Sequence, residues 1–185
     1  MKGMIWNINT ELGSLTLREQ IEPEDESDII ALFRACDDWF EAATGGPSAP
    51  GDVQSLFYSL PEGANMNDKR LFTLRDDGDI IGLVDAVLHY PSPQSCAIGT
   101  FLIAPSYRRH RAGTLAAHLL LDEARSAGLD HITATVPDGW RPGIEFLKSL
   151  GFEIGDIQPR STNRRIHDHE PPVRRATLTL ASPGT

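Results

Sequence analysis

The sequence predicts one α/β domain built on a mixed, mostly antiparallel sheet with helices packed against it. Three observations lead to this prediction. The 185 residues suit a single domain. Strand-like and helix-like patterns alternate along nearly the whole chain. A tight turn at 76–79 joins two strands directly, whereas a helix separates the strands at 95–103 and 131–136, so the first pair is antiparallel and the second parallel.

The N-terminal third begins as a strand and continues as helices. Residues 15–20 alternate between apolar and polar side chains, which is typical of a half-buried strand. Pro23 suits a first helical turn, and apolar residues follow at helical spacing. The stretch 45–52 is rich in Gly, Pro and Ser and reads as a loop. The elements expected here are a strand at 15–20, a helix that runs from Pro23 and stops before Gly45, and a short helix at 53–60.

The remaining elements are separated by clear turn and stop signals. The run Asp76-Asp77-Gly78-Asp79 favours a hairpin turn. Gly128 and Gly151 each follow an apolar helical pattern, at the place where glycine ends a helix. A polar loop is expected at 161–172. The expected strands are 70–75, 80–90, 95–103, 131–136, 152–157 and 173–180, and the expected helices are about 110–127 and 142–150.

The composition excludes several classes of protein. Hydrophobic residues make up 40% and charged residues 23%, which is ordinary for a folded globular domain. Cys36 and Cys96 are too few for a disulfide scaffold. No apolar run approaches the roughly 20 residues of a membrane span, and residues 1–14 are too polar for a secretory peptide. We therefore expect a cytoplasmic protein with no membrane partner.

The net charge of −9 is unevenly distributed. Residues 1–79 hold 16 acidic and 6 basic side chains, whereas residues 80–185 hold 10 acidic and 11 basic ones. The overall negative charge argues against a nucleic-acid partner. The asymmetry suits a cationic substrate beside the acidic half and an anionic cofactor beside the other half. Solvated acidic helices and loops explain it equally well.

The segment 103–114 carries the clearest chemical signal. It lies between an expected strand and an expected helix, and backbone N–H groups at a helix N-terminus bind anions. Gly113 allows an anion to approach the backbone closely. Positive charge is added by Arg108, Arg109, His110 and Arg111. The segment predicts a phosphate or pyrophosphate ligand, with a simple basic turn that caps the helix as the alternative.

This segment resembles the acyl-CoA pyrophosphate loop of the GNAT N-acetyltransferase superfamily, whose pattern is V-x-P-x-Y-R-x-x-G-x-G/A. The matching residues are Ile103, Pro105, Tyr107, Arg108 and Gly113. Arg111 departs from the pattern, because the family usually has glycine there. Two consequences stay open: Arg111 still offers its N–H group to the cofactor, or it weakens cofactor binding.

A second segment, 140–152, is similar to the family pattern N-x-x-A-I-x-F-Y-x-x-L-G-F. The matching residues are Gly143, Ile144, Phe146, Leu150, Gly151 and Phe152. Trp140 replaces the asparagine often found beside the cofactor. Leu147 replaces the tyrosine that protonates the departing thiolate in many members.

The resemblance covers a core of about 15–181 within a single domain spanning 1–185. It implies two central parallel strands that splay apart, acetyl-CoA as the cofactor with CoA as a product, and an amine as the acceptor, which is either a small-molecule amine or an N-terminal or lysyl amine. Members commonly dimerise, and the last strand is a candidate interface. The helices at 33–60 are expected to wall the acceptor site. The implied cofactor-binding residues are Phe101, Leu102, Ile103, Arg108, Arg109, His110, Arg111, Ala112, Gly113 and Thr114.

The usual catalytic residues do not carry over. Gly99 and Thr100 occupy the positions where many members have a glutamate that acts as the general base. On the expected strand 80–90, the side chains of Ile81, Leu83, Asp85, Val87 and His89 share one face. Asp85 is therefore a carboxylate among apolar neighbours, which needs a partner or a raised pKa. We predict Asp85 as the general base; an aspartate bonded to a backbone amide or an arginine is the structural alternative.

The leading hypothesis is an acetyl-CoA-dependent N-acetyltransferase. The first alternative is a non-catalytic acyl-CoA-binding module that has lost the usual acid and base, and the second is a partner-binding protein without affinity for CoA. Trp39, Phe40, Phe57 and Tyr58 are candidates either for an acceptor pocket or for the core. His167 and His169 flank Asp168, but a polar loop is favoured, and no metal is predicted.

Overall fold

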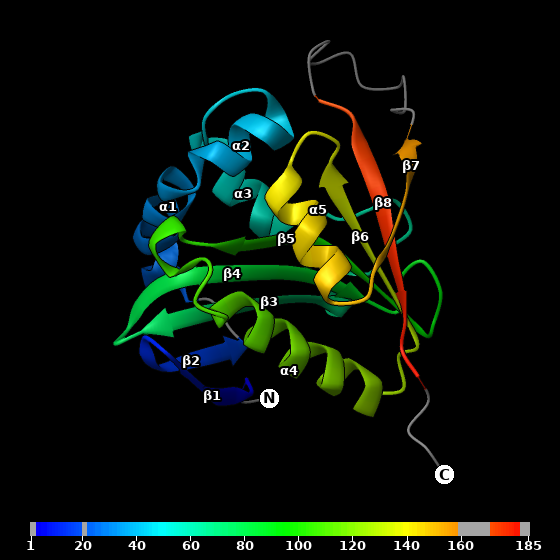
Figure 1. Cartoon of the computed structure of the whole chain (residues 1–185), viewed down its shortest axis with the longest axis horizontal. Coiled ribbons are helices and arrows are strands. Elements are labelled where there is room, and N and C mark those ends of the chain that lie inside the picture. Colours follow the sequence, from blue (N-terminus) through cyan, green and yellow to red (C-terminus); the bar gives the residue numbers. More distant parts are fainter. Residues whose placement is uncertain (1–2, 20–21, 159–170, 182–185) are drawn as a thin grey trace.

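The computed structural model of the protein describes residues 3–19, 22–158 and 171–181, whose eight strands form one twisted sheet (Figure 1). The spatial order is β1-β2-β3-β4-β5-β6-β8-β7, and β5 and β6 are the one parallel pair among the described strands. The strands are β1 (Ile5–Thr10), β2 (Gly13–Glu19), β3 (Lys69–Asp76), β4 (Asp79–Leu88), β5 (Ser95–Ile103), β6 (His131–Pro137), β7 (Glu153–Gln158) and β8 (Val173–Thr179).

Helices cover both faces of the sheet (Figure 1). The N-terminal helices pack on one face, and the two helices of the second half lie on the other. Asp77 and Gly78, in the predicted hairpin turn, both have positive φ, as a tight two-residue hairpin requires. The predicted α/β fold with a mixed sheet is confirmed. The helices are α1 (Glu26–Ala35), α2 (Asp37–Thr44), α3 (Pro50–Tyr58), α4 (Ala112–Ser126) and α5 (Arg141–Ser149).

Side chains alternate between the two faces along the central strands, so that each face of the sheet has its own core. Leu83 and Leu102 pack against Phe33 and the other buried side chains of α1, α2 and α3. On the opposite face, Leu74 packs beneath the first turns of α4. Because successive strand residues point to opposite faces, both sets come from the same strands.

Two bulges change which residues share a face. Leu74 pairs with Gly82 and Arg75 with Ile80, which leaves Ile81 without a partner on β3. Ile81 consequently packs under α4, while Leu83 faces α1–α3. The predicted single face running from Ile81 to His89 is therefore wrong at both ends, since β4 also stops at Leu88.

The second bulge lies where β5 leaves β6. Asp85 pairs with Thr100 and Ala86 with Ile98, so Gly99 is the extra residue. The parallel pairing of β5 with β6 covers only 95–98 against 131–134. Beyond Ile98, β5 stays bonded to β4 alone, and the predicted splay of the two parallel strands is confirmed.

Two predictions about the N-terminal elements need correction. A strand, β1, precedes the expected start at residue 15 and forms a hairpin with β2. The single helix expected from Pro23 to just before Gly45 is two helices, α1 and α2, because the backbone turns at Cys36 (φ −99°, ψ 26°); the ring centroids of Phe33 and Phe40 lie 5.0 Å apart. The last strand, β8, lies between β6 and β7, and a dimer interface at this strand stays a prediction.

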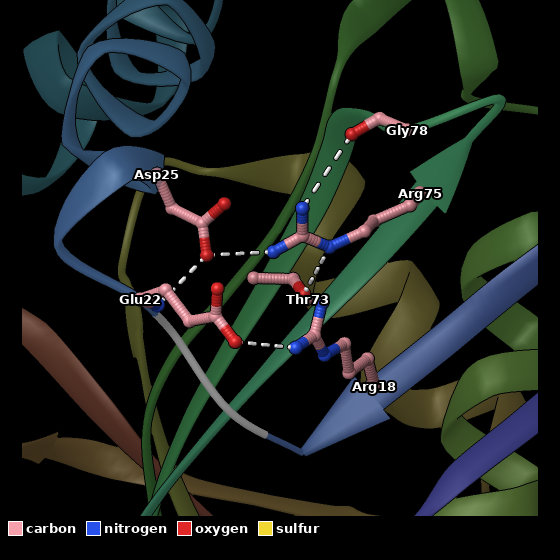
Figure 2. Close-up of polar contacts among 6 residues, drawn as sticks. All are labelled: Arg18, Glu22, Asp25, Thr73, Arg75 and Gly78. Atoms are coloured by element: carbon pink, nitrogen blue, oxygen red, sulfur yellow. Dashed lines mark hydrogen bonds and ion pairs between the residues drawn. The ribbon is translucent and has the colours of Figure 1, made fainter.

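A buried polar cluster attaches the start of α1 to the sheet (Figure 2). Arg75 on β3 donates to the Asp25 carboxylate at 2.8 Å and to the Thr73 hydroxyl at 3.0 Å. The Glu22 N–H group donates to the same carboxylate at 2.8 Å. The side chains of Asp25 and Arg75 are each only 12% exposed, so this ion pair belongs to the core rather than to the solvated surface.

In the described part of the chain, no helix has the length and apolar character that crossing a membrane would need. Within the same residues, no group of three or more His, Cys, Asp or Glu side chains could hold a metal ion. His167, Asp168 and His169 lie outside the described residues.

Candidate functional site

The predicted phosphate loop connects the end of β5 to the start of α4. Arg109 and Arg111 both adopt left-handed backbone conformations, with φ of 65° and 63°. The first helical bond of α4 runs from the Leu115 N–H group to the Arg111 carbonyl, at 2.9 Å. The N–H groups of the three residues before Leu115 therefore have no acceptor within the helix. A 15-residue helix with open N–H groups at its start favours an anion there.

A groove of about 690 Å³ lies in front of this loop, between α2, α5 and the free side of β5. It brings together eight of the ten predicted cofactor-binding residues: Phe101, Leu102, Ile103, Arg108, Arg109, Arg111, Gly113 and Thr114. His110 does not line the groove. The Ala112 side chain is 1% exposed beneath α4, so only its backbone is available to a ligand.

Arg108 holds the loop to its neighbours. Its Nε donates to the Ile103 carbonyl at 2.8 Å, and its guanidinium pairs with the Asp38 carboxylate of α2 at 2.5 Å. The guanidinium carbon also lies 5.9 Å from the Trp140 ring centroid. The bond from Arg108 holds the pKa of the Asp38 carboxyl below its ordinary value. Asp38 already balances the charge of Arg108. Arg108 therefore offers less positive charge to an anion than the exposed Arg109 and Arg111 do.

The backbone geometry at two positions explains why the family pattern has glycine there. A Cβ atom at Gly113 would lie 3.2 Å from Cγ1 of Ile103, so the first turn of α4 packs on β5 too closely for an unadjusted side chain. At Arg111, φ is 63°, which glycine adopts freely and arginine adopts at a cost of about 1–2 kcal/mol. Arg111 keeps the loop conformation, and its side chain is exposed.

Asp85 has a partner that the sequence reasoning missed. Nζ of Lys69 lies 2.9 and 3.0 Å from the two carboxylate oxygens, and it also donates to the Ser59 carbonyl after α3 at 3.0 Å. The Lys69 side chain is 5% exposed and that of Asp85 is 15% exposed. Burial raises the pKa of the Asp85 carboxyl above its ordinary value, although the Lys69 ammonium acts in the opposite direction.

The carboxylate of Asp85 lies beneath the bulge where the parallel strands separate. A Cβ atom built on Gly99 would lie 3.1 Å from Oδ2 of Asp85. The carboxylate thus occupies the space that a side chain at residue 99 would enter. Gly99 and Asp85 are consequently coupled: a larger residue on β5 would collide with the acid supplied by β4.

The chain offers no obvious side-chain acid here. Leu147 packs into the apolar cluster between α5 and the sheet. Among the described residues, the linings of the groove and of the neighbouring cavity include no tyrosine, histidine or lysine. Burial raises the pKa of the Cys96 thiol to about 12, and burial also raises that of Cys36. Both thiols are therefore protonated near neutral pH and are poor nucleophiles.

The aromatic candidates divide between site and core. Trp39 lines the groove, whereas Phe40 is 4% exposed and belongs to the core. Tyr58 is 73% exposed. Trp140 lines the groove against Gly143, where an added Cβ atom would lie 2.5 Å from Cδ1 of the indole. The tryptophan and the glycine therefore depend on each other.

The comparisons with known proteins agree with this geometry. The sequence model of the acetyltransferase (GNAT) family matches residues 33–152. The chain belongs to this family. The predicted family is confirmed, and with it the prediction of an acyltransferase. The comparison with curated proteins gives no match.

Solved GNAT structures share the fold at low sequence identity. A probable acetyltransferase from Chromobacterium violaceum superposes with a TM-score of 0.71 at 17% identity, covering 89% of this chain and 82% of that one. The GNAT domain of PAT from S. lividans gives 0.68 at 14%, covering 95% and 97%. The ribosomal-protein-S18-alanine N-acetyltransferase from Escherichia coli gives 0.60 at 19%, covering 92% and 96%.

Proposed function

We propose that this GNAT protein transfers an acetyl group from acetyl-CoA to the primary amine of a small, cationic molecule. The observation that carries the proposal is the position of the Asp85 carboxylate, beneath Gly99 at the point where β5 leaves β6. A groove lies in front of the open N–H groups of α4, and a neighbouring cavity is lined by Gly99. We assign the reaction to the region of this carboxylate and the anion of the donor to the open N–H groups.

The residues present fit acetyl-CoA. The open amides at the start of α4 and the exposed guanidinium groups of Arg109 and Arg111 suit the pyrophosphate. The side of β5 that faces away from β4 offers backbone groups beyond Ile98 to an extended arm, apart from the Ile103 carbonyl, which Arg108 already occupies. The bound thioester would supply the activated acetyl group.

Holding the two reactants together is the main contribution of the chain. The groove fixes the donor, and α1, α2 and α3 wall the opposite face of the sheet, from which the amine approaches. Such positioning alone accounts for a large part of the acceleration in two-substrate reactions. Backbone N–H groups of β5 at the opening are suited to stabilise negative charge on the carbonyl oxygen during attack.

Asp85 is the proposed general base, because an amine must lose a proton to attack and complete the transfer. Its raised pKa brings it closer to neutral pH, where a carboxylate is a more effective base. Lys69 fixes the orientation of both carboxylate oxygens. The acidic N-terminal half of the chain, with 16 acidic and 6 basic side chains in 1–79, favours a cationic acceptor.

Two observations favour a second candidate, a non-catalytic acyl-CoA-binding module. The Lys69 ammonium already neutralises Asp85, and Leu147 stands where the family usually has a tyrosine acid. In this reading the ion pair only stabilises the bulge. The groove would bind acyl-CoA without turning it over.

Thiol release from acetyl-CoA, measured over a panel of amines, separates the two candidates. We expect turnover with cationic amines, and a loss of about 10²–10⁴-fold in Asp85→Asn, the usual contribution of general-base catalysis. CoA affinity should be unchanged, and the loss should shrink as pH rises because more amine is already neutral. Asp156→Asn, at an exposed position of β7, is the matched control.

Two outcomes would contradict the proposal. CoA binding without turnover of any amine would favour the binding module. An unchanged rate and pH profile in folded Asp85→Asn would leave Asp85 with a structural role only.

A further inference from the structure

A second cavity, of about 440 Å³, adjoins the cofactor groove and extends beneath α4. The two spaces are neighbours, because five residues line both of them: Trp39, Phe101, Trp140, Gly143 and Phe146. From there the cavity passes Gly99 at the splay and runs under the C-terminal half of the helix. It thus leads away from the phosphate loop.

Small side chains create this hollow. Ala86 on β4, Ala134 on β6 and Ala117 and Ala124 on α4 all line it, where larger residues would fill the gap between helix and sheet. The first turns of α4 are tightly packed on the sheet, whereas its C-terminal half is only partly buried. A protein interior is normally close-packed, and an open apolar space forfeits contacts.

The lining restricts what can occupy the cavity. Most of the other side chains of its wall are aliphatic or aromatic, and they include Val84, Leu88, Ile98, Leu129, Ile132 and Phe152. Three charged residues line it in the described chain: Glu19 and Arg70, which pair with each other at 3.2 Å, and Glu123 on α4. An uncharged hydrocarbon suits this largely apolar wall, whereas an anionic group would lose its hydration there.

We propose that the cavity binds the acyl chain of the donor, and that this chain is straight, uncharged and longer than acetyl. The inference rests on the proposed acyl transfer from CoA to an amine, and it replaces the acetyl group by a longer chain. We place the phosphates of the donor at the start of α4 and its thioester at the splay. The acyl atoms beyond the carbonyl carbon can then enter the cavity beside Gly99 and Ala134. An acetyl group would leave most of this space empty. Each further methylene that becomes buried should tighten binding roughly fourfold.

Calorimetric titration with two unreactive thioethers, S-ethyl-CoA and S-octyl-CoA, tests the proposal without requiring turnover. S-octyl-CoA is expected to bind at least about tenfold more tightly than S-ethyl-CoA. Ala124→Leu, which fills the cavity, should abolish that difference and leave S-ethyl-CoA binding unchanged. Ala31→Leu, at an exposed position of α1, is the matched control and should preserve the difference.

The other outcomes identify which statement fails. Equal affinity for the two thioethers would overturn the acyl-chain inference and leave the proposed function intact. Tighter binding of S-octyl-CoA that survives Ala124→Leu would place the chain elsewhere, which also overturns it. Binding of neither thioether would refute both the inference and the proposed use of an acyl-CoA donor.

Discussion

Removing the ammonium of Lys69 should make the stability of the protein strongly dependent on pH. Lys69→Met deletes both bonds to the Asp85 carboxylate and one bond to the Ser59 carbonyl, in a place where the lysine side chain is 5% exposed. Breaking a buried pair by removing one partner costs about 3–5 kcal/mol while the other charge remains. The carboxyl group avoids that cost by keeping its proton.

The sign of the effect follows from the pKa of Asp85. Burial already holds it above the value of 3.8, and loss of Lys69 removes the influence that lowers it. A raised native pKa contributes stability that is fully present below the unfolded value and is lost as pH rises through the native value. Relative to wild type, the variant should lose about 1 kcal/mol near pH 4, from the lost hydrogen bond, and about 3–5 kcal/mol near pH 8.

Urea unfolding at pH 4.5 and at pH 8 measures the difference. Lys148→Met, at an exposed position of α5, is the matched control and should change the free energy of unfolding little at either pH. The acidic limb of the acetyl-transfer rate should also move to higher pH in Lys69→Met. An equal loss of stability at both pH values would refute the reasoning.

Two further predictions concern the folded framework. Asp25→Asn should destabilise the protein by about 3–5 kcal/mol near pH 7, because it leaves Arg75 buried without its counter-charge. Burial acts to raise the pKa of Asp25, but the bonds from Arg75 and Glu22 and the nearby arginine charges together lower it, so in wild type this contribution should be lost as pH falls below about 4. The unfolding free energies of the two proteins, measured with denaturant, should therefore converge in acid, and a difference that does not change with pH would contradict the prediction. Arg111→Gly should raise the free energy of unfolding by up to about 1 kcal/mol by relieving the left-handed arginine, and a lower melting temperature in calorimetry would show that the Arg111 side chain stabilises the loop.

The periodic parts of the fold were predictable from the sequence. The strand at 95–103 has the predicted bounds, and the turn at Asp77 and Gly78 adopts the positive φ that its residues favour. The apolar pattern of the sequence could not locate the two bulges, because one extra residue in a strand hardly changes the amino-acid composition of that strand. The face assignment failed at Ile81 for that reason, whereas Asp85, between the bulges, keeps the face of Leu83.

Contacts between distant segments could not be predicted from the sequence. The pairing of Arg108 with Asp38 joins residues 70 positions apart, and no local pattern marks it. Lys69 lies 16 positions from Asp85, and only the register of β3 against β4 brings the two together. The phosphate loop was recognisable because its residues are contiguous and its function depends on a helix N-terminus, which the sequence does mark.

We infer that CoA binds with its phosphates at the start of α4 and its thiol beside Gly99. A crystal structure of the protein with CoA tests it most directly. We expect pyrophosphate density against the backbone N–H groups of 112–114, and density for the thiol at the splay, on the side of β5 that β6 leaves open. Density for CoA at any other surface, with this groove closed by side chains, would contradict the account.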